Sequence, residues 1–138
     1  MRKLLVVTAL LLFAGIAFGQ TLQKNGVVAI HMWTVKLNPD VTMNQFLKFW
    51  EEDFIPTFEE AIPEMKAFVI KGAQDHNKYQ YGGLYVWESM EELRKYFNSD
   101  GSPTENAAPA LEKMTSMMDE IAKYGEFTYT ADDYVIIQ

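Results

Sequence analysis

One short segment, residues 81–97, constrains the fold of this chain most strongly, because it predicts a strand that runs directly into a helix. Its first part, Tyr81–Trp87, is rich in aromatic residues, which favour a strand. Ser89 and Glu92 follow with the S-x-x-E spacing of a capping box. In such a box the serine oxygen accepts a free helix N–H and the glutamate reaches back to the serine N–H. The sequence therefore predicts a helix over Met90–Phe97 that starts where the strand ends.

Other segments also predict strands. Val27–Leu37 is apolar on both alternating faces, which is typical of a strand covered on both sides. The same pattern predicts a strand over Met65–Ala73, and the polar stretch Gln74–Lys78 then reads as a hairpin loop. The strand and the capped helix that it runs into together form the strand–helix joint, and this strand is expected to start at Tyr79. A last strand is expected over residues 128–137.

Helices are predicted between these strands. Thr42 and Gln45 form a second capping box and are followed by apolar residues at helical spacing. Pro56 should kink or end this regular helix, because proline has no N–H and crowds the preceding turn. A final helix is expected to begin near residues 106–109 and to stop at Tyr124–Gly125. Its apolar stripe consists of Leu111, Met114, Met117, Met118 and Ile121.

The order of these elements predicts an α+β fold of the ferredoxin-like, split βαβ type with a four-stranded antiparallel sheet. In a lone domain of this type helices cover only one face of the sheet, so the other face should be polar. Here the strands are apolar on both faces. Burial of the second face against another copy removes this conflict, and we expect a homodimer in which the two sheets meet to form an α/β barrel.

The N-terminal residues resemble an export signal. Arg2 and Lys3 precede an apolar run, Leu4–Phe18, and small residues lie at the positions read by a signal peptidase. A retained membrane anchor is the alternative, but the run is shorter than the ~20 residues that a span needs. We expect residues 1–19 to be a signal peptide and residues 20–138 to form one domain, exported to the periplasm or the extracellular space.

Composition excludes several classes of function. The chain has no cysteine, which removes thiolate nucleophiles, cysteine zinc sites and Fe–S clusters. Its formal net charge is −7, and it has no cluster of basic residues. Nucleic acids and anionic membrane surfaces are therefore not expected partners, because both need grouped lysine and arginine. Composition alone does not exclude haem, which a histidine could ligate, but we expect no metal or cofactor.

His31 is the candidate catalytic residue. It lies in the middle of an apolar strand, where burial and neighbours can bring the pKa of a histidine close to working pH. It could then act as a general base. The competing interpretation is a structural histidine held by hydrogen bonds in the core or in a dimer interface.

Four aromatic residues are candidates for substrate binding: Trp33, Trp50, Tyr85 and Trp87. Trp33 shares a strand face with His31, and Tyr85 or Trp87 can come from a neighbouring strand. An aromatic pocket with one histidine would suit a flat organic substrate. Ordinary core packing explains the same residues.

Three other features are weaker candidates. Asp53 could line the same cleft, but a solvated side chain is the simpler interpretation. His76 lies in the predicted hairpin loop with only Asp75 beside it, which is too few ligands for a metal. The methionines of the last helix could form an adaptable ligand surface, or simply pack against the sheet.

The residues of the strand–helix joint resemble the dimeric α/β-barrel superfamily, which includes the antibiotic-biosynthesis monooxygenase-like proteins. The resemblance covers about residues 27–137. It is carried by Gly-Leu-Tyr-Val-Trp-Glu-Ser-Met-Glu-Glu-Leu at residues 83–93, by Tyr96–Phe97, and by Phe46, Phe49, Trp50 and Ile55–Pro56 on the first helix. The pattern marks the fold, since members range from cofactor-independent oxygenases to haem-degrading enzymes, isomerases and dye peroxidases.

The haem-degrading branch carries a haem-ligating histidine on the helix after the joint. The corresponding stretch here, Thr104–Met114, has no histidine. Together with the export signal, the resemblance implies an exported protein that binds a small hydrophobic or aromatic molecule and that could be a cofactor-independent monooxygenase. The alternative from another class is a non-enzymatic exported binding or assembly module. An enclosed cavity with His31 in its wall would favour the enzyme, and a space filled by Trp33, Trp50 and the methionines would favour the module.

Overall fold

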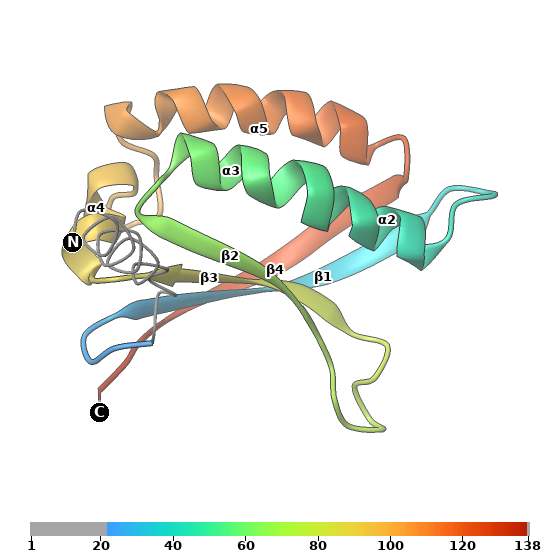
Figure 1. Ribbon diagram of the computed structural model, residues 1–138, viewed down its shortest axis with the longest axis horizontal. Coiled ribbons are helices and arrows are strands. Elements are labelled where there is room, and N and C mark those ends of the chain that lie inside the picture. Colours follow the sequence, from blue (N-terminus) through green and yellow to red (C-terminus); the bar gives the residue numbers. More distant parts are fainter. Residues whose placement is uncertain (1–21, 138) are drawn as a thin grey trace, which may run out of the picture.

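A computed structural model describes residues 22–137 as two layers, a sheet and the helices that cover one of its faces (Figure 1). The sheet is antiparallel and has the strand order β2-β3-β1-β4. Its strands are β1 (Val27–Leu37), β2 (Met65–Lys71), β3 (Tyr81–Trp87) and β4 (Gly125–Val135). The predicted α+β, ferredoxin-like fold with a four-stranded antiparallel sheet is therefore confirmed. The predicted signal peptide, residues 1–19, lies outside the described residues.

The helices lie between the strands in the predicted order. α2 (Met43–Phe49), a π-helical turn (Trp50–Phe54) and α3 (Ile55–Ala61) connect β1 to β2. After β3 come α4 (Met90–Tyr96), a 3₁₀ turn (Glu105–Ala107) and α5 (Ala108–Ile121). No helix in residues 22–137 has both the length and the apolar character needed to cross a membrane.

The first helical segment begins and bends as the sequence predicts. Thr42 Oγ1 accepts the N–H of Gln45 at 3.3 Å, and Gln45 Oε1 accepts the N–H of Thr42 at 2.8 Å, so the capping box is complete. The regular α-helix ends at Phe49, and the π turn precedes Pro56. A π turn changes the hydrogen-bond step along the helix, and Pro56 then lies in the first turn of α3, where its missing N–H costs little.

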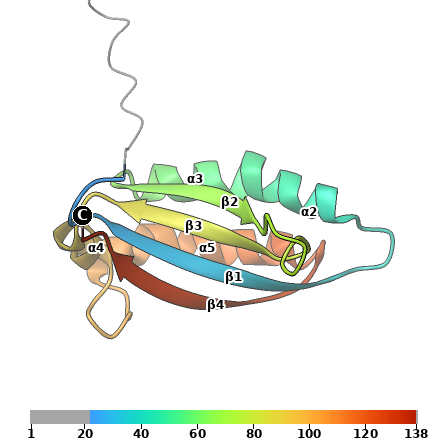
Figure 2. The same cartoon turned by 90° about the horizontal axis from the view of Figure 1, so that it is seen from below.

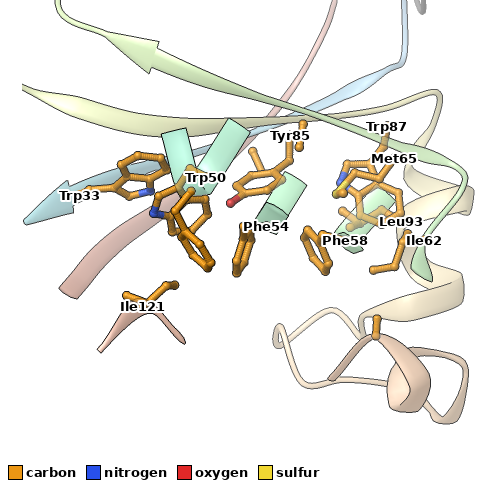
Figure 3. Close-up of a cluster of buried hydrophobic side chains, with 14 of the residues drawn as sticks. Trp33, Trp50, Phe54, Phe58, Ile62, Met65, Tyr85, Trp87, Leu93 and Ile121 are labelled. Atoms are coloured by element: carbon orange, nitrogen blue, oxygen red, sulfur yellow. The ribbon is translucent and has the colours of Figure 1, made fainter. Parts of the chain in front are cut away.

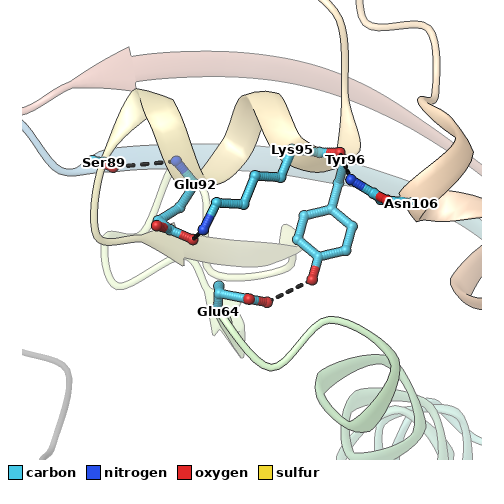
Figure 4. Close-up of polar contacts among 6 residues, drawn as sticks. All are labelled: Glu64, Ser89, Glu92, Lys95, Tyr96 and Asn106. Atoms are coloured by element: carbon cyan, nitrogen blue, oxygen red, sulfur yellow. Dashed lines mark hydrogen bonds and ion pairs between the residues drawn. The ribbon is translucent and has the colours of Figure 1, made fainter.

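The strand–helix joint is confirmed with one difference. Ser89 Oγ accepts the N–H of Glu92 at 3.2 Å, as predicted, but the Glu92 carboxylate bonds Lys95 Nζ at 2.6 Å (Figure 4). The hydroxyl of Tyr96, also on α4, donates a hydrogen bond of 2.6 Å to Oε2 of Glu64, the residue just before β2. Two distant segments are thus tied together, and this fixes the position of α4 at one end of the sheet.

Several predicted boundaries were wrong, including those of the last strand, which was expected over residues 128–137 and is Gly125–Val135. β2 and β3 are shorter than expected at the hairpin, and Tyr79 is not in a strand but 81% exposed in the loop. α5 ends at Ile121 and not at Gly125, which instead begins β4. A Cβ on Gly125 would collide with the backbone oxygen of Lys36, so this glycine permits close approach of two strands and is not a helix stop.

The two faces of the sheet differ in burial. The face below α3 and α5 carries the core, part of which Figure 3 shows. Its most deeply buried side chains are those of Phe46, Ile62, Met65, Ile121 and Val27. Figure 2 shows the sheet from the opposite side, which the helices leave uncovered. The alternation of side chains along a strand places Ile30, Leu84 and Phe68 on this face. They are partly or largely accessible, and Phe68 is 49% exposed. The second apolar face predicted from sequence is present and uncovered in the single chain.

Candidate functional site

A cleft of about 410 Å³ lies between the sheet and the helices. Its floor comes from alternate residues of β1, β3 and β4, and its roof from α3, the π turn before it and α5. At one end it is closed by α4 and the loop that follows. The residues that line it include Ala29, His31, Trp33, Trp50, Phe54, Phe58, Met65, Tyr85, Trp87, Leu93, Arg94, Phe97, Met114, Met118, Phe127, Tyr129 and Asp133. Most of these side chains are apolar or aromatic, which is the usual lining of a small-molecule site.

The five residues predicted from sequence all line this one cleft: His31, Trp33, Trp50, Tyr85 and Trp87. The strand register explains how they meet, because Ala29 pairs with Tyr85 and Val27 with Trp87 across β1 and β3. Residues two apart on each strand then share the face that points to the helices.

The tryptophans belong to the core as well as to the cleft. Trp33 and Trp50 stack with ring centroids 4.3 Å apart, and Trp50 is only 2% exposed. Trp50 Nε1 is buried without a hydrogen-bond partner among residues 22–137. Figure 3 shows Trp33, Trp50, Tyr85 and Phe58 along one face of the sheet. The core-packing interpretation therefore holds for these residues, and a cleft remains beside them.

His31 lies half-buried between two tyrosine rings. Its ring centroid is 4.7 Å from that of Tyr85, with the rings tilted by 55°, and 4.9 Å from that of Tyr129, with the rings parallel within 3°. Burial lowers the pKa of His31 below its ordinary value of 6.5, and the nearby Asp133 carboxylate partly opposes this. The imidazole is therefore neutral near pH 7. No residue in the described part of the chain makes a hydrogen bond to it, so it can accept a proton.

The side chain of Tyr85 extends along β3 and covers Gly83 on the same strand. A Cβ placed on Gly83 would lie 2.8 Å from Tyr85 Oη and 2.9 Å from its Cε2 atom. Gly83 is also the residue that pairs with His31 across the strands. The Tyr85 ring thus occupies the space of a side chain next to His31. Burial raises the pKa of Tyr85 above its ordinary value of 10.0, and the neighbouring Tyr129 adds to this, so the phenol stays protonated.

Polar groups are few and lie toward the α4 end of the cleft. Arg94 donates from Nη1 to the backbone oxygen of Asn98 at 2.8 Å, and it lines the cleft together with Ser99. Asp133 comes from β4, where it pairs with Ala29. These charges are the groups that a polar end of a ligand would meet.

Sequence reasoning missed Tyr129, Asp133 and Arg94. For the first two a signal was present, because pairing of β4 with β1 places alternate β4 residues on the His31 face. Arg94 had none, since an arginine in a short amphipathic helix is typical of a solvated face.

Two weaker candidates lie elsewhere. Asp53 is exposed on the π turn, beside a shallow groove formed with Gln45, Lys48 and Tyr124. His76 is exposed in the hairpin loop. Within residues 22–137, no three histidine, aspartate or glutamate side chains gather closely enough to hold a metal ion.

Comparisons with known proteins give only distant structural similarity. No protein-family model matches the sequence, and no curated protein matches it. One similar solved structure is SnoaB, a cofactor-independent oxygenase from Streptomyces nogalater, with 12% identity over 83% of this chain and 95% of that chain, at a TM-score of 0.45. A point variant of SnoaB gives 14% identity over the same shares, at a TM-score of 0.49.

A dimeric protein of unknown function with a ferredoxin-like fold, from Bacteroides fragilis, is also similar. It gives 17% identity over 79% of this chain and 96% of that chain, at a TM-score of 0.35. The ferredoxin-like fold of the present chain rests on its own strand order and register, given above, and similarities of this size say nothing about its substrate.

Proposed function

We propose that this protein binds a planar aromatic molecule in the cleft and oxygenates it without a cofactor, with His31 as the base. One observation carries the proposal: a neutral, half-buried histidine without a hydrogen-bond partner in residues 22–137 lies in the wall of an aromatic cleft of about 410 Å³. A base of this kind needs no ion or cofactor to take a proton from a weakly acidic substrate. The sequence resemblance to monooxygenase-like proteins agrees with this choice.

The reaction needs an electron-rich substrate with an acidic C–H next to a carbonyl group. His31 takes one proton, and the resulting carbanion passes an electron to O₂. Recombination of the radical pair gives a peroxide anion on carbon, which takes the proton back from His31. The resulting hydroperoxide loses water and leaves a new C=O. One oxygen atom of O₂ ends in the product and the other in water, and the electrons come from the two C–H bonds of the methylene carbon. The aromatic walls of the cleft hold the ring system and exclude bulk water.

The test is oxygen uptake with a planar substrate that has such a methylene group, for example dithranol. Uptake by the wild-type protein should exceed the uncatalysed rate. His31→Gln should lower the protein-dependent rate by about 100-fold, because it removes the base. His76→Gln changes the other histidine, which is exposed and far from the chemistry, and should leave the rate unchanged. Uptake equal to the uncatalysed rate with the wild-type protein would contradict the proposal.

Export and dimerisation belong to the same proposal. The signal-peptide pattern of residues 1–19 supports a periplasmic or extracellular protein. The uncovered apolar face of the sheet, with Ile30, Leu84 and Phe68, supports a homodimer joined through its sheets. The cleft lies on the other side of each sheet, so both copies would keep an open site.

The same apolar face favours the second candidate function, a non-enzymatic binding or assembly module. A binding or assembly module would use the uncovered apolar face of the sheet for association and would need no base in the cleft. The two functions separate in the His31→Gln variant, which retains dimerisation in both cases. Loss of oxygen uptake in this variant supports the enzyme, whereas uptake that does not depend on the protein leaves the module.

A further inference from the structure

The Tyr85 hydroxyl lies in an apolar environment without a partner. The residue is 7% exposed, and its ring contacts Phe58 edge-on at 5.9 Å between centroids. No hydrogen bond joins Tyr85 Oη to another group within residues 22–137. Among residues 22–137 only Trp50 Nε1 is a fully buried side-chain polar atom without a partner, so Tyr85 Oη keeps some access to the cleft that the residue lines. A group that enters the cleft can therefore accept a hydrogen bond from it.

The position of this hydroxyl is fixed by the backbone. Gly83 has no side chain, and the Tyr85 ring fills the space that a Cβ would take. Because Gly83 pairs with His31, the phenol lies beside the imidazole on the same face of the sheet. A neutral acceptor of protons and a neutral donor of a hydrogen bond therefore face the same part of the cleft.

We propose that Tyr85 Oη donates a hydrogen bond to the oxygen atom of the bound aromatic molecule on which negative charge develops when His31 takes its proton. The assignment rests on the proposed function and adds its substrate class: a planar phenol or aryl ketone whose oxygen lies next to the reacting carbon. The proton moves from substrate carbon or oxygen to His31, and the charge left behind is delocalised onto the oxygen that Tyr85 holds. Tyr85 keeps its own proton throughout.

The chemistry of the two groups fits this division of work. A phenol that stays protonated is a donor at all working pH values, and a donor aimed at developing charge in a dry site is worth far more than in water. Asp133 lies near enough to His31 to favour the imidazolium that forms. The transfer thus creates one anion and one cation, and each has a protein group in place to stabilise it.

The test uses para-nitrophenol, whose colour reports how much of it is phenolate. Its apparent pKa is measured when it is bound to the wild-type protein and to Tyr85→Phe. The variant lacks only the donor, so the bound probe should become less acidic by about one to two units. Tyr81→Phe, on the same strand but outside the cleft, is the matched control and should give the wild-type value. A Gly83→Ala variant, which pushes the phenol from its place, should shift the probe in the same direction as Tyr85→Phe.

Each outcome decides between the two proposals. Binding with the same pKa in wild type and Tyr85→Phe overturns the role of Tyr85 and leaves the proposed function standing. A shift in Tyr129→Phe with none in Tyr85→Phe also overturns it, because the other phenol beside His31 would then be the donor. Failure of the wild-type protein to bind the probe overturns the proposed binding of planar phenols and this assignment with it. If Gly83→Ala does not fold, the comparison of Tyr85→Phe with Tyr81→Phe still decides.

Discussion

Tyr129 lies flat against His31, with the two ring planes 3° from parallel and the centroids 4.9 Å apart. Tyr129 is 54% exposed and comes from β4, at the edge of the sheet, whereas His31 is half-buried on the neighbouring strand β1. The phenol ring therefore covers one face of the imidazole and separates it from water. This cover contributes to the burial that keeps the histidine neutral.

Removal of this cover should change the acidity of His31. In Tyr129→Ala water reaches the imidazole, the cost of charging it falls, and its pKa should rise toward the ordinary value of 6.5. An NMR titration of the histidine ring protons measures this directly. His76, exposed in the hairpin loop, is the internal reference. An unchanged or further lowered pKa of His31 would show that Tyr129 does not shield it.

Oxygenation should depend on pH through His31. The base must be neutral, so the rate should be constant above the lowered pKa and fall as the pH drops through it. Profiles of wild type and Asp133→Asn separate the causes. The Asp133 carboxylate raises the pKa of His31, so its removal should move the acid limb of the profile to lower pH. A limb that moves to higher pH would contradict this account.

The bond between Tyr96 and Glu64 should stabilise the protein over a defined pH range. Tyr96→Phe should lower the free energy of unfolding by about 1 kcal/mol at neutral pH, a value reduced for the partial exposure of both groups. The hydrogen bond lowers the pKa of Glu64 from its ordinary 4.5 and raises the pKa of Tyr96 to about 12.

The sign of each shift gives the window of this stabilisation. It is complete above the ordinary pKa of Glu64 and is lost as the pH falls through the lowered one. At the alkaline end it is complete below the ordinary pKa of tyrosine and is lost as the pH rises through about 12. Urea unfolding of wild type and Tyr96→Phe at neutral and acid pH checks this. A difference that persists after Glu64 is protonated would mean that lost packing, and not the hydrogen bond, is its cause. Tyr79→Phe, in the exposed loop, should have no effect.

The outer face of the sheet should hold two copies together. Phe68→Glu places a charge on the uncovered apolar face, on the edge strand β2, and should convert a dimer to a monomer in light scattering. Tyr79→Glu introduces the same charge on another exposed aromatic residue, in the hairpin loop, and should leave the dimer intact. A wild-type protein that is monomeric at micromolar concentration would contradict the homodimer.

Much of the fold could be predicted from local patterns. The capping residues Thr42 and Ser89 mark the starts of two helices, and the bounds of β1 follow from its apolar run. The end of α5 was missed because Gly125 has a long-range reason to be glycine, the close approach of β4 to Lys36, which no local pattern reveals.

The site could be predicted only in part, because some of its contacts join residues that lie far apart in the sequence. Trp33, Tyr85 and Trp87 could be placed beside His31, since the period of a strand assigns them to one face. The parallel contact of Tyr129 with His31 depends on the register between β1 and β4, strands about 90 residues apart in sequence. The volume of the cleft depends on how the helices pack, and a list of aromatic residues cannot distinguish a filled core from a core with a cleft beside it.

The central claim is that the cleft at His31 receives a planar aromatic molecule. The protein has only two histidines, so titration with a naphthol, followed by NMR of the histidine rings, tests it directly. The signals of His31 should move in a saturable way while those of His76 stay in place. If neither histidine moves, or if both move together without saturation, the molecule does not bind beside His31 and the proposed function is wrong.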